Sequence, residues 1–352
     1  MTPLAREITA RITRNGPMPV QEFMRLCLEH PEHGYYRTQP AIGAAGDFVT
    51  APEISQVFGE LIGLWAAGIW AAIGRPSPVM LVEFGPGRGT LMADALRAIA
   101  KVAPEFRRAL GVHLVDINTA LRPQQEAALQ HAAPRWHNTI TTLPDGPLIV
   151  IANEFFDALP VRQIVRTESG WRERCVAVDN GRLVFAAGPA VEWQDDASVG
   201  SVIETSPDSE VRMRALAQRI VRHRGAALVI DYGPFEAGAG DTLQAVRRQQ
   251  KVDPLAEPGL ADLTAHVDFA RLAATARSEG AASHGPVTQG TLLRRLGVAV
   301  RAATLVKSAG AKGPAIEAAI ARLIEPQQMG TLFKALAIVD SRQPPPPGFD
   351  PL

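Results

Sequence analysis

Short apolar runs alternate along this chain with longer stretches of helical periodicity. Each run is bounded by turn-forming residues, as expected for buried parallel strands. The runs lie at residues 79–84, 112–116, 136–141, 147–152 and 226–231. Between and after them the pattern predicts helices at about 90–102, 119–130, 208–223 and 268–278. This alternation predicts an α/β protein with a parallel sheet and helices on both faces.

Other segments depart from that rhythm. Residues 3–30 read as two helices separated by a turn, and a further helix is expected from Pro52 to about Ala72. Residues 161–187 predict three antiparallel strands joined by tight turns, which indicates an insertion. Two final strands are expected at 281–288 and 332–339, with small helices between them over 290–325.

These patterns give three regions. We predict an N-terminal helical or lid region over residues 1–75 and a core over 76–342, with insertions at about 161–207 and 290–328. A Pro-rich tail, 343–352, is expected to be poorly ordered.

Composition narrows the functional classes. The chain has 352 residues, of which 46% are hydrophobic and 20% charged, and its 36 basic residues balance 36 acidic ones. This balance argues against a general nucleic-acid binder. Cys27 and Cys175 cannot form a disulfide framework, and no Cys/His cluster indicates zinc. No apolar run reaches the roughly 18 residues of a membrane helix. We therefore expect a bacterial cytoplasmic protein without metal or membrane insertion.

A glycine-rich turn follows the first apolar run. It reads Glu83-Phe84-Gly85-Pro86-Gly87-Arg88-Gly89-Thr90 and leads into a predicted helix. Glycines in such a turn let the backbone bend sharply and approach a ligand closely. The second run ends at Asp116, where an acid can accept hydrogen bonds from two ribose hydroxyls. The pattern predicts a nucleotide-containing cofactor that is bound by Gly85, Gly87, Gly89 and Asp116.

Two cofactor classes suit such a turn, NAD(P) and S-adenosylmethionine. The dinucleotide fingerprint is GxGxxG, but Thr90 stands at its third glycine. The spacing from Gly85 to Asp116 also exceeds the roughly 20 residues expected for that fingerprint. Glu83 would repel a pyrophosphate and suits a cation such as the amino group of S-adenosylmethionine. The charge favours the methyl donor, and an NAD(P)-dependent oxidoreductase is the less favoured alternative.

A second polar motif, Asn153-Glu154-Phe155-Phe156-Asp157, follows the fourth run. Ligands of open parallel sheets bind outside the carboxyl ends of the strands, so a substrate is expected there. The carboxylates of Glu154 and Asp157 match the planar fork of a guanidinium. A close carboxylate can localise the guanidinium charge and accept a proton, which makes both residues candidate catalytic groups. The alternative is that Asn153 and Asp157 cap the next helix.

Six blocks in order resemble the MidA family of S-adenosylmethionine-dependent methyltransferases, across roughly residues 15–340. They are HPEHGYY (30–36), GDFVTAPEIS (46–55), EFGPGRGT (83–90), NEFFDALP (153–160), IDYG (230–233) and DLTAHVDF (262–269). Two departures stand out. Asp116 stands where Glu is commoner and keeps the charge. Gln249 and Gln250 stand where the family usually has a His-Lys pair, so this chain lacks the imidazole of that pair.

The resemblance implies a class I methyltransferase fold, a Rossmann-like and mostly parallel seven-stranded sheet with helical and β insertions. It implies S-adenosylmethionine as cofactor, with Asp47 and Thr50 in a lid over it and Glu83 and Asn153 beside it. The mitochondrial members are arginine methyltransferases acting in complex I assembly. A protein substrate, such as a complex I type subunit, is therefore expected.

Several alternatives stay open from the sequence. Thr50 can serve as a helix cap instead of a lid residue. His266 can assist proton transfer near neutral pH, although a lone histidine is more often structural. The chain can also be a non-catalytic assembly factor that uses the fold to hold a partner. A homodimer is compatible with the inserted segments.

Overall fold

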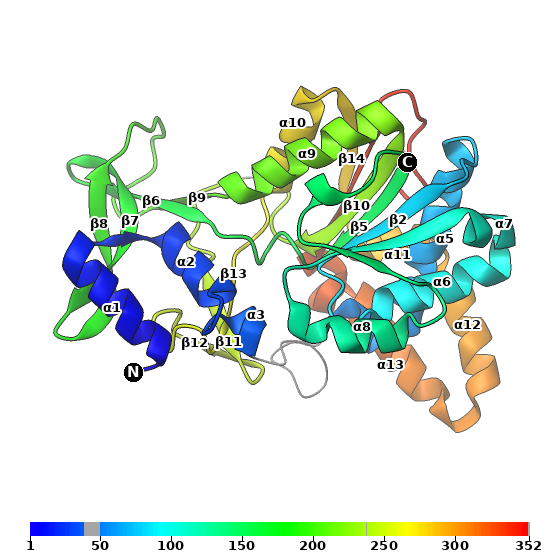
Figure 1. The fold of residues 1–352 in the computed structure, drawn as a ribbon, viewed down its shortest axis with the longest axis horizontal. Coiled ribbons are helices and arrows are strands. Elements are labelled where there is room, and N and C mark those ends of the chain that lie inside the picture. The colour runs from blue at the N-terminus through cyan, green and yellow to red at the C-terminus, as the bar shows by residue number, and fades with distance from the viewer. Residues whose placement is uncertain (39–49, 237, 351–352) are drawn as a thin grey trace. The chain divides into compact units, whose positions relative to one another are not determined.

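The computed structural model describes residues 1–38, 50–236 and 238–350. The contacts within the chain divide it into two units. Unit 1 comprises Met1–Phe48, Asp157–Val211 and Glu236–Asp268. Unit 2 comprises Val49–Phe156, Arg212–Phe235 and Phe269–Leu352. Figure 1 shows the helices and strands of both units.

Unit 2 is built on a seven-stranded sheet in the order β14-β15-β10-β5-β2-β3-β4. Its strands are β2 (Val79–Phe84), β3 (Leu110–Val115), β4 (Arg135–His137), β5 (Leu148–Asn153), β10 (Gly225–Tyr232), β14 (Ala281–Thr288) and β15 (Phe333–Asp340). The first five are parallel, whereas β15 runs antiparallel to β10 and β14. This is the predicted class I methyltransferase sheet, and every residue of β2, β5, β10 and β15 is buried.

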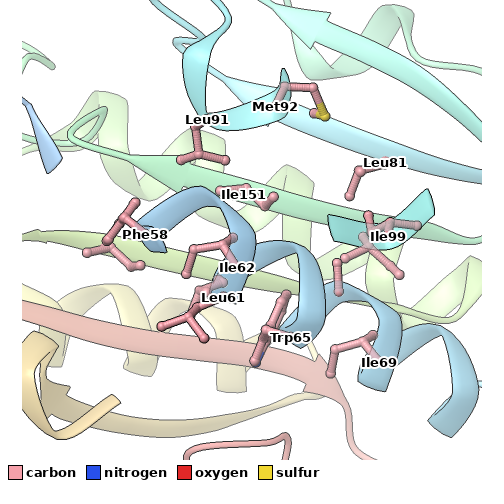
Figure 2. Close-up of a cluster of buried hydrophobic side chains, with 14 of the residues drawn as sticks. Phe58, Leu61, Ile62, Trp65, Ile69, Leu81, Leu91, Met92, Ile99 and Ile151 are labelled. Atoms are coloured by element: carbon pink, nitrogen blue, oxygen red, sulfur yellow. The ribbon is translucent and has the colours of Figure 1, made fainter. Parts of the chain in front are cut away.

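Helices cover both faces of this sheet (Figure 1). The α-helices that lie in unit 2 or, for α9, mostly in it are α4 (Ala51–Ile54), α5 (Gln56–Ala72), α6 (Thr90–Val102), α7 (Pro104–Ala109), α8 (Arg122–Ala128), α9 (Pro207–His223), α10 (Phe269–Ser278), α11 (Gln289–Arg295), α12 (Val298–Ala309) and α13 (Gly313–Ile324). Alternate strand residues such as Leu81 and Ile151 pack with Trp65 of α5 and Ile99 of α6 in one core (Figure 2). The residues between them point to the opposite face.

The described residues of unit 1 form three helices at the N-terminal end and two small sheets. The helices are α1 (Pro3–Asn15), α2 (Val20–Glu29) and α3 (Tyr35–Thr38). One sheet is antiparallel and contains β1 (Met18–Pro19), β6 (Arg162–Thr167), β7 (Gly170–Asp179), β8 (Arg182–Ala190) and β9 (Val202–Thr205). The predicted antiparallel strands over 161–187 are thereby confirmed. Asn180 and Gly181 both have positive φ at the β7–β8 turn, as a tight hairpin requires.

A second sheet of unit 1 was not expected from the sequence. It consists of β11 (Gln244–Arg247), β12 (Gln250–Val252) and β13 (Asp262–Thr264). Gln249, one of the two residues that depart from the family pattern, lies at φ 61° in the β11–β12 turn, and Gln250 begins β12. These strands are three or four residues long, so their alternation is too brief to identify in the sequence.

Several expected boundaries change in the structure. The helix predicted from Pro52 to Ala72 is two helices, because Ser55 adopts an extended conformation and caps α5. Residues 49–75 belong to unit 2, which differs from the expected region 1–75. The strand expected at 136–141 is shorter, since Thr139 starts a 3-10 turn.

The Pro-rich tail was wrongly expected to be poorly ordered. Phe349 is buried in the core of unit 2, and Arg295 donates a hydrogen bond to the carbonyl of Gly348 at 3.0 Å. Pro347 lies against Gly68 of α5. The Pro-rich composition of the tail predicts disorder, but the single large apolar side chain of Phe349 packs it against unit 2.

Candidate active site

The carboxyl ends of four parallel strands align at one edge of the sheet. Phe84 of β2 pairs with Val115 of β3 and with Ala152 of β5, while Asn153 pairs with Ile230 of β10. The glycine-rich turn, Asp116, the Asn153–Glu154 pair and Asp231 therefore leave the sheet at one edge. This is where open parallel sheets bind ligands.

The glycine-rich turn has the backbone that its sequence predicts. Gly85, Gly87 and Gly89 have φ values of 60°, 52° and 83°. A Cβ at Gly85 would lie 3.1 Å from the ring of Phe155, so a side chain there would be crowded as well as strained. The N–H of Gly89 donates to the carbonyl of Pro86 at 2.8 Å, which closes the turn just before α6.

Glu83 is buried at the end of β2. Its carboxyl group accepts a hydrogen bond from the backbone N–H of Met92 in the first turn of α6. Burial, and to a lesser extent the charge of Asp116, raises the pKa of Glu83 to about 8. Its Oε2 atom has no hydrogen-bond partner among the described residues. A buried acceptor without a donor is uncommon in native proteins, which makes Glu83 a candidate ligand-binding residue.

Asn153 presents a second such acceptor. It is 8% exposed, and its Oδ1 has no partner within the part of the chain that the structure describes. Residues two apart in a strand point to the same face of the sheet. Glu83 therefore lies on the face of Leu81, and Asn153 on the face of Ile151, which is the face that α5 and α6 cover. Acceptors on one face of adjacent strands suit a cationic group with several N–H donors.

Asp116 is held by its neighbours just beyond β3. Its Oδ1 accepts from the backbone N–H of Asn118 at 2.8 Å, and its Oδ2 accepts from Nε2 of Gln125 at 3.0 Å. Gln125 also donates to the carbonyl of Gly87 at 2.8 Å. Gln125 could not be singled out from the sequence, because no pattern in it shows that α8 faces the glycine-rich turn.

Glu154 combines a strained backbone with a fixed side chain. Its φ is 50°, and its N–H donates to the carbonyl of Ile230 at 2.9 Å. Its Oε1 accepts from the backbone N–H of Ala51 and from Nδ2 of Asn153, both at 3.1 Å. Burial raises the pKa of Glu154, and these two hydrogen bonds partly offset the effect. No helix follows β5 directly, so the helix-capping alternative for Asn153 and Asp157 is wrong.

Asp231 fixes the turn that carries Glu154. This residue at the end of β10 has no solvent exposure. Its Oδ2 accepts from the backbone N–H groups of Phe155 at 3.1 Å and Phe156 at 2.9 Å, and its Oδ1 from that of Tyr232 at 3.0 Å. The aspartate of the IDYG block therefore fixes the backbone that follows Glu154.

Thr50, just before α4, and Glu53, within α4, are the next candidate residues. Thr50 occupies the cap position, but its side chain makes no capping hydrogen bond. Glu53 accepts a hydrogen bond from the Thr90 hydroxyl at 2.6 Å and lies 3.6 Å from Arg88 of the glycine-rich turn. Asp47, the other expected lid residue, lies outside the described residues. The lid stays a prediction.

Two expected catalytic residues belong to unit 1. The carbonyl of Asp157 accepts from the N–H of Ala265 at 3.0 Å, next to His266 in sequence. His266 is exposed, and its own N–H donates to the Thr242 hydroxyl at 2.8 Å. Their catalytic roles stay predictions. Tyr35, from the HPEHGYY block, is a core residue of unit 1 with no solvent exposure.

The sequence and fold of the chain match known proteins. A profile of the family described as "Putative S-adenosyl-L-methionine-dependent methyltransferase" matches residues 61–287, more than half of the chain. The chain belongs to this family. It is 36% identical over 373 residues to the rat protein named protein arginine methyltransferase NDUFAF7, mitochondrial, covering 96% of this chain and 85% of that one. The human protein of that name is 34% identical, with 96% and 84% covered.

A solved structure supports the same assignment. A protein from Burkholderia thailandensis, crystallised with S-adenosyl-homocysteine, superposes with a TM-score of 0.86 at 30% identity. The match covers 99% of this chain and 92% of that protein. The fold, the enzyme class and the cofactor expected from the sequence are thus confirmed, and the oxidoreductase alternative is wrong.

The residues at the sheet edge fit the cofactor of this family. S-Adenosylmethionine supplies an electrophilic methyl group on a sulfonium and carries an ammonium and a ribose. The partnerless acceptors of Glu83 and Asn153 suit the ammonium, whereas Asp116 suits the ribose hydroxyls. The open backbone of the glycine-rich turn allows close approach of the ligand. These contacts remain predictions at the level of single residues.

No group of His, Cys, Asp or Glu within residues 1–38, 50–236 and 238–350 is arranged to hold a metal ion. In the same residues, no helix has the length and apolarity that crossing a membrane requires.

Proposed function

We propose that this methyltransferase methylates an arginine side chain of a partner protein. The position of Glu154 carries the proposal, since it brings a carboxyl group to the edge of the sheet beside the glycine-rich turn. A carboxylate attracts a guanidinium through its charge and accepts hydrogen bonds from its N–H groups. The names of the rat and human relatives, both protein arginine methyltransferases, support the same substrate class.

The side chain of Glu154 is suited to this task. Its Oε1 is occupied by Ala51 and Asn153, and Oε2 has no hydrogen-bond partner among the described residues. We assign Oε2 to the guanidinium. Methyl transfer forms a bond between a guanidinium nitrogen and the methyl carbon and breaks the carbon–sulfur bond. The nitrogen loses one proton, which Glu154 accepts and passes to solvent; a raised pKa favours that step near neutral pH.

The partner that we propose is a subunit of a complex I type respiratory enzyme, methylated in the bacterial cytoplasm. The six-block resemblance supports this choice, because mitochondrial members of the MidA family act in complex I assembly. Asp157 and His266 are proposed to assist, the first in binding the guanidinium and the second in proton transfer.

Transfer of radiolabelled methyl groups to lysate proteins tests the proposal. Glu154→Gln keeps an oxygen that can accept from Ala51, so the fold should survive while the charge is lost. Its transfer rate should fall by roughly 10²–10⁴, the range for a general base. Its affinity for S-adenosyl-homocysteine should stay near that of the parent. Glu168→Gln, on an exposed turn, is the control and should behave as the parent.

Two results would contradict parts of the proposal. If Glu154→Gln transfers methyl groups at the parent rate, the residue does not activate the substrate. If hydrolysed product carries the label on lysine, glutamine or a small molecule, the substrate is not arginine, although the chain is still a methyltransferase.

A further inference from the structure

Gln125 is a fully buried amide that lies between two parts of the cofactor region. It belongs to α8 and has no solvent exposure. One side-chain nitrogen reaches both the carbonyl of Gly87, at 2.8 Å, and Oδ2 of Asp116, at 3.0 Å. Gln125 thus joins the glycine-rich turn after β2 to the acid after β3.

The orientation of this amide is fixed by Trp136 of β4. The indole Nε1 donates to Oε1 of Gln125 at 2.7 Å, and an indole N–H can only donate. The carbonyl of Gly87 and the carboxylate of Asp116 can only accept. A flipped amide would face a donor with its NH₂ group and two acceptors with its oxygen, so only the observed orientation satisfies the three partners.

Both donor hydrogens of Gln125 are used at the cofactor region. One holds the carbonyl of Gly87, which has a φ of 52°, and the other holds one oxygen of Asp116. The backbone N–H of Asn118 holds the other oxygen. The direction of the Asp116 carboxylate is therefore set before a ligand arrives, which lowers the ordering cost of binding.

We propose that Gln125 is a positioning residue for S-adenosylmethionine, which raises cofactor affinity by holding Asp116 toward the ribose and in register with the glycine-rich turn. The inference rests on the assignment of Asp116 and Gly87 to the cofactor. Gln125 itself acts through these residues, and Trp136 acts through Gln125.

Calorimetry with S-adenosyl-homocysteine tests the proposal. Gln125→Met keeps the length of the side chain but removes both donors, so affinity should fall about 10- to 100-fold, as for lost hydrogen bonds to a charged group. Gln125→Glu places a carboxyl oxygen against two other acceptors, the carbonyl of Gly87 and Oδ2 of Asp116. Its loss should be larger and should grow as pH rises, because the introduced carboxyl ionises beside Asp116. Trp136→Phe, which removes only the orienting donor, should show a smaller loss.

An analogue of S-adenosyl-homocysteine without the two ribose hydroxyls separates positioning from general stability. Because the analogue cannot use Asp116, Gln125→Met should lower its affinity by no more than about 3-fold, far less than for the parent ligand. At saturating S-adenosylmethionine, Gln125→Met should keep nearly the parent kcat, and its defect should appear as a higher KM for the cofactor. Gln124, exposed on the same helix, provides matched controls in Gln124→Met and Gln124→Glu, which should bind as the parent.

The possible failures are distinguishable. Unchanged affinity in Gln125→Met overturns the positioning role, as does an equal loss for both ligands, which would show a structural role only. Asp116→Ala serves as the reference. If it leaves the affinity for S-adenosyl-homocysteine intact, the assignment of Asp116 to the cofactor fails, and the positioning role fails with it.

Discussion

Glu154 has a φ of 50°, in the left-handed region that non-glycine residues seldom occupy. Such a conformation costs about 1–3 kcal/mol and persists only where the surroundings enforce it. Here three consecutive N–H groups, from Glu154 to Phe156, donate to Ile230 and Asp231 at the end of β10. The carboxyl group of Glu154 accepts from the N–H of Ala51 at the start of α4. This local outlier supports a functional role for Glu154, and the Glu154→Gln rate measurement tests it.

The buried carboxyl of Glu83 predicts a pH dependence. Its pKa is raised to about 8 in the folded chain, against about 4.3 for a free glutamate. Between these values the folded state keeps a proton that the unfolded state releases, so the stability of the ligand-free protein should fall as pH rises through that window. Glu83→Gln removes this contribution. Urea unfolding at pH 5, 6, 7 and 8 should show a shallower decline for the variant.

Cofactor binding should reverse the protonation of Glu83. A ligand ammonium favours the carboxylate, so binding near pH 7 should release a proton. Calorimetry in two buffers of different ionisation enthalpy measures that release, which Glu83→Gln should lose. Glu105→Gln, exposed on α7, is the control. Equal pH slopes and equal proton release in Glu83→Gln and the parent would show that Glu83 does not titrate in this window.

At the scale of elements, the close approach of α5 to α6 supports the glycine-rich turn that begins α6. Gly59 and Gly63 of α5 lie one helical turn apart on the face toward α6. A Cβ at Gly59 would lie 2.6 Å from the Cβ of Asp94, and a Cβ at Gly63 would lie 2.6 Å from the carbonyl oxygen of Ala95. The two backbones can touch because these residues have no side chain.

Gly63→Ala should destabilise unit 2 although alanine is the better helix former. Its intrinsic preference contributes about 1 kcal/mol in favour of the variant. The clash falls on the backbone of α6, which cannot move cheaply, and overpacking typically costs about 1–3 kcal/mol. We expect a lower midpoint in urea. Gly68→Ala, on the same helix, meets only the ring of Pro347 and should be milder. A stabilised Gly63→Ala would disprove the close packing.

At the scale of the whole molecule, the sequence predicted the sheet of unit 2 better than the division of the chain. The strands of that sheet are apolar runs flanked by glycines and acids, so their pattern identified them and placed Glu83, Asp116 and Glu154 at one edge. Unit 1 is assembled from three segments that are distant in sequence, and local periodicity carries no information on which distant segments meet.

The same limit explains the residues that the sequence did not reveal. Gln125 looks like any polar residue of a short helix, and only the packing of α8 brings it to Gly87 and Asp116. Phe349 stands in a tail whose prolines suggested disorder, yet it packs in the core of unit 2 against Gly285. In both cases one side chain forms long-range contacts that the residues next to it in the sequence do not predict.

Phe349 provides the prediction at this largest scale. Phe349→Ala should lower the stability of unit 2 by about 3 kcal/mol, because it leaves a cavity in a core that α11, β14 and β15 also line. Unfolding in urea, followed by the fluorescence to which Trp65, Trp70 and Trp136 of unit 2 contribute, measures the loss. Asp350→Ala, at the exposed next position, should unfold as the parent does. If Phe349→Ala keeps the parent midpoint, Phe349 does not contribute to the core. If the midpoint falls, Phe349 completes the core that supports the cofactor edge.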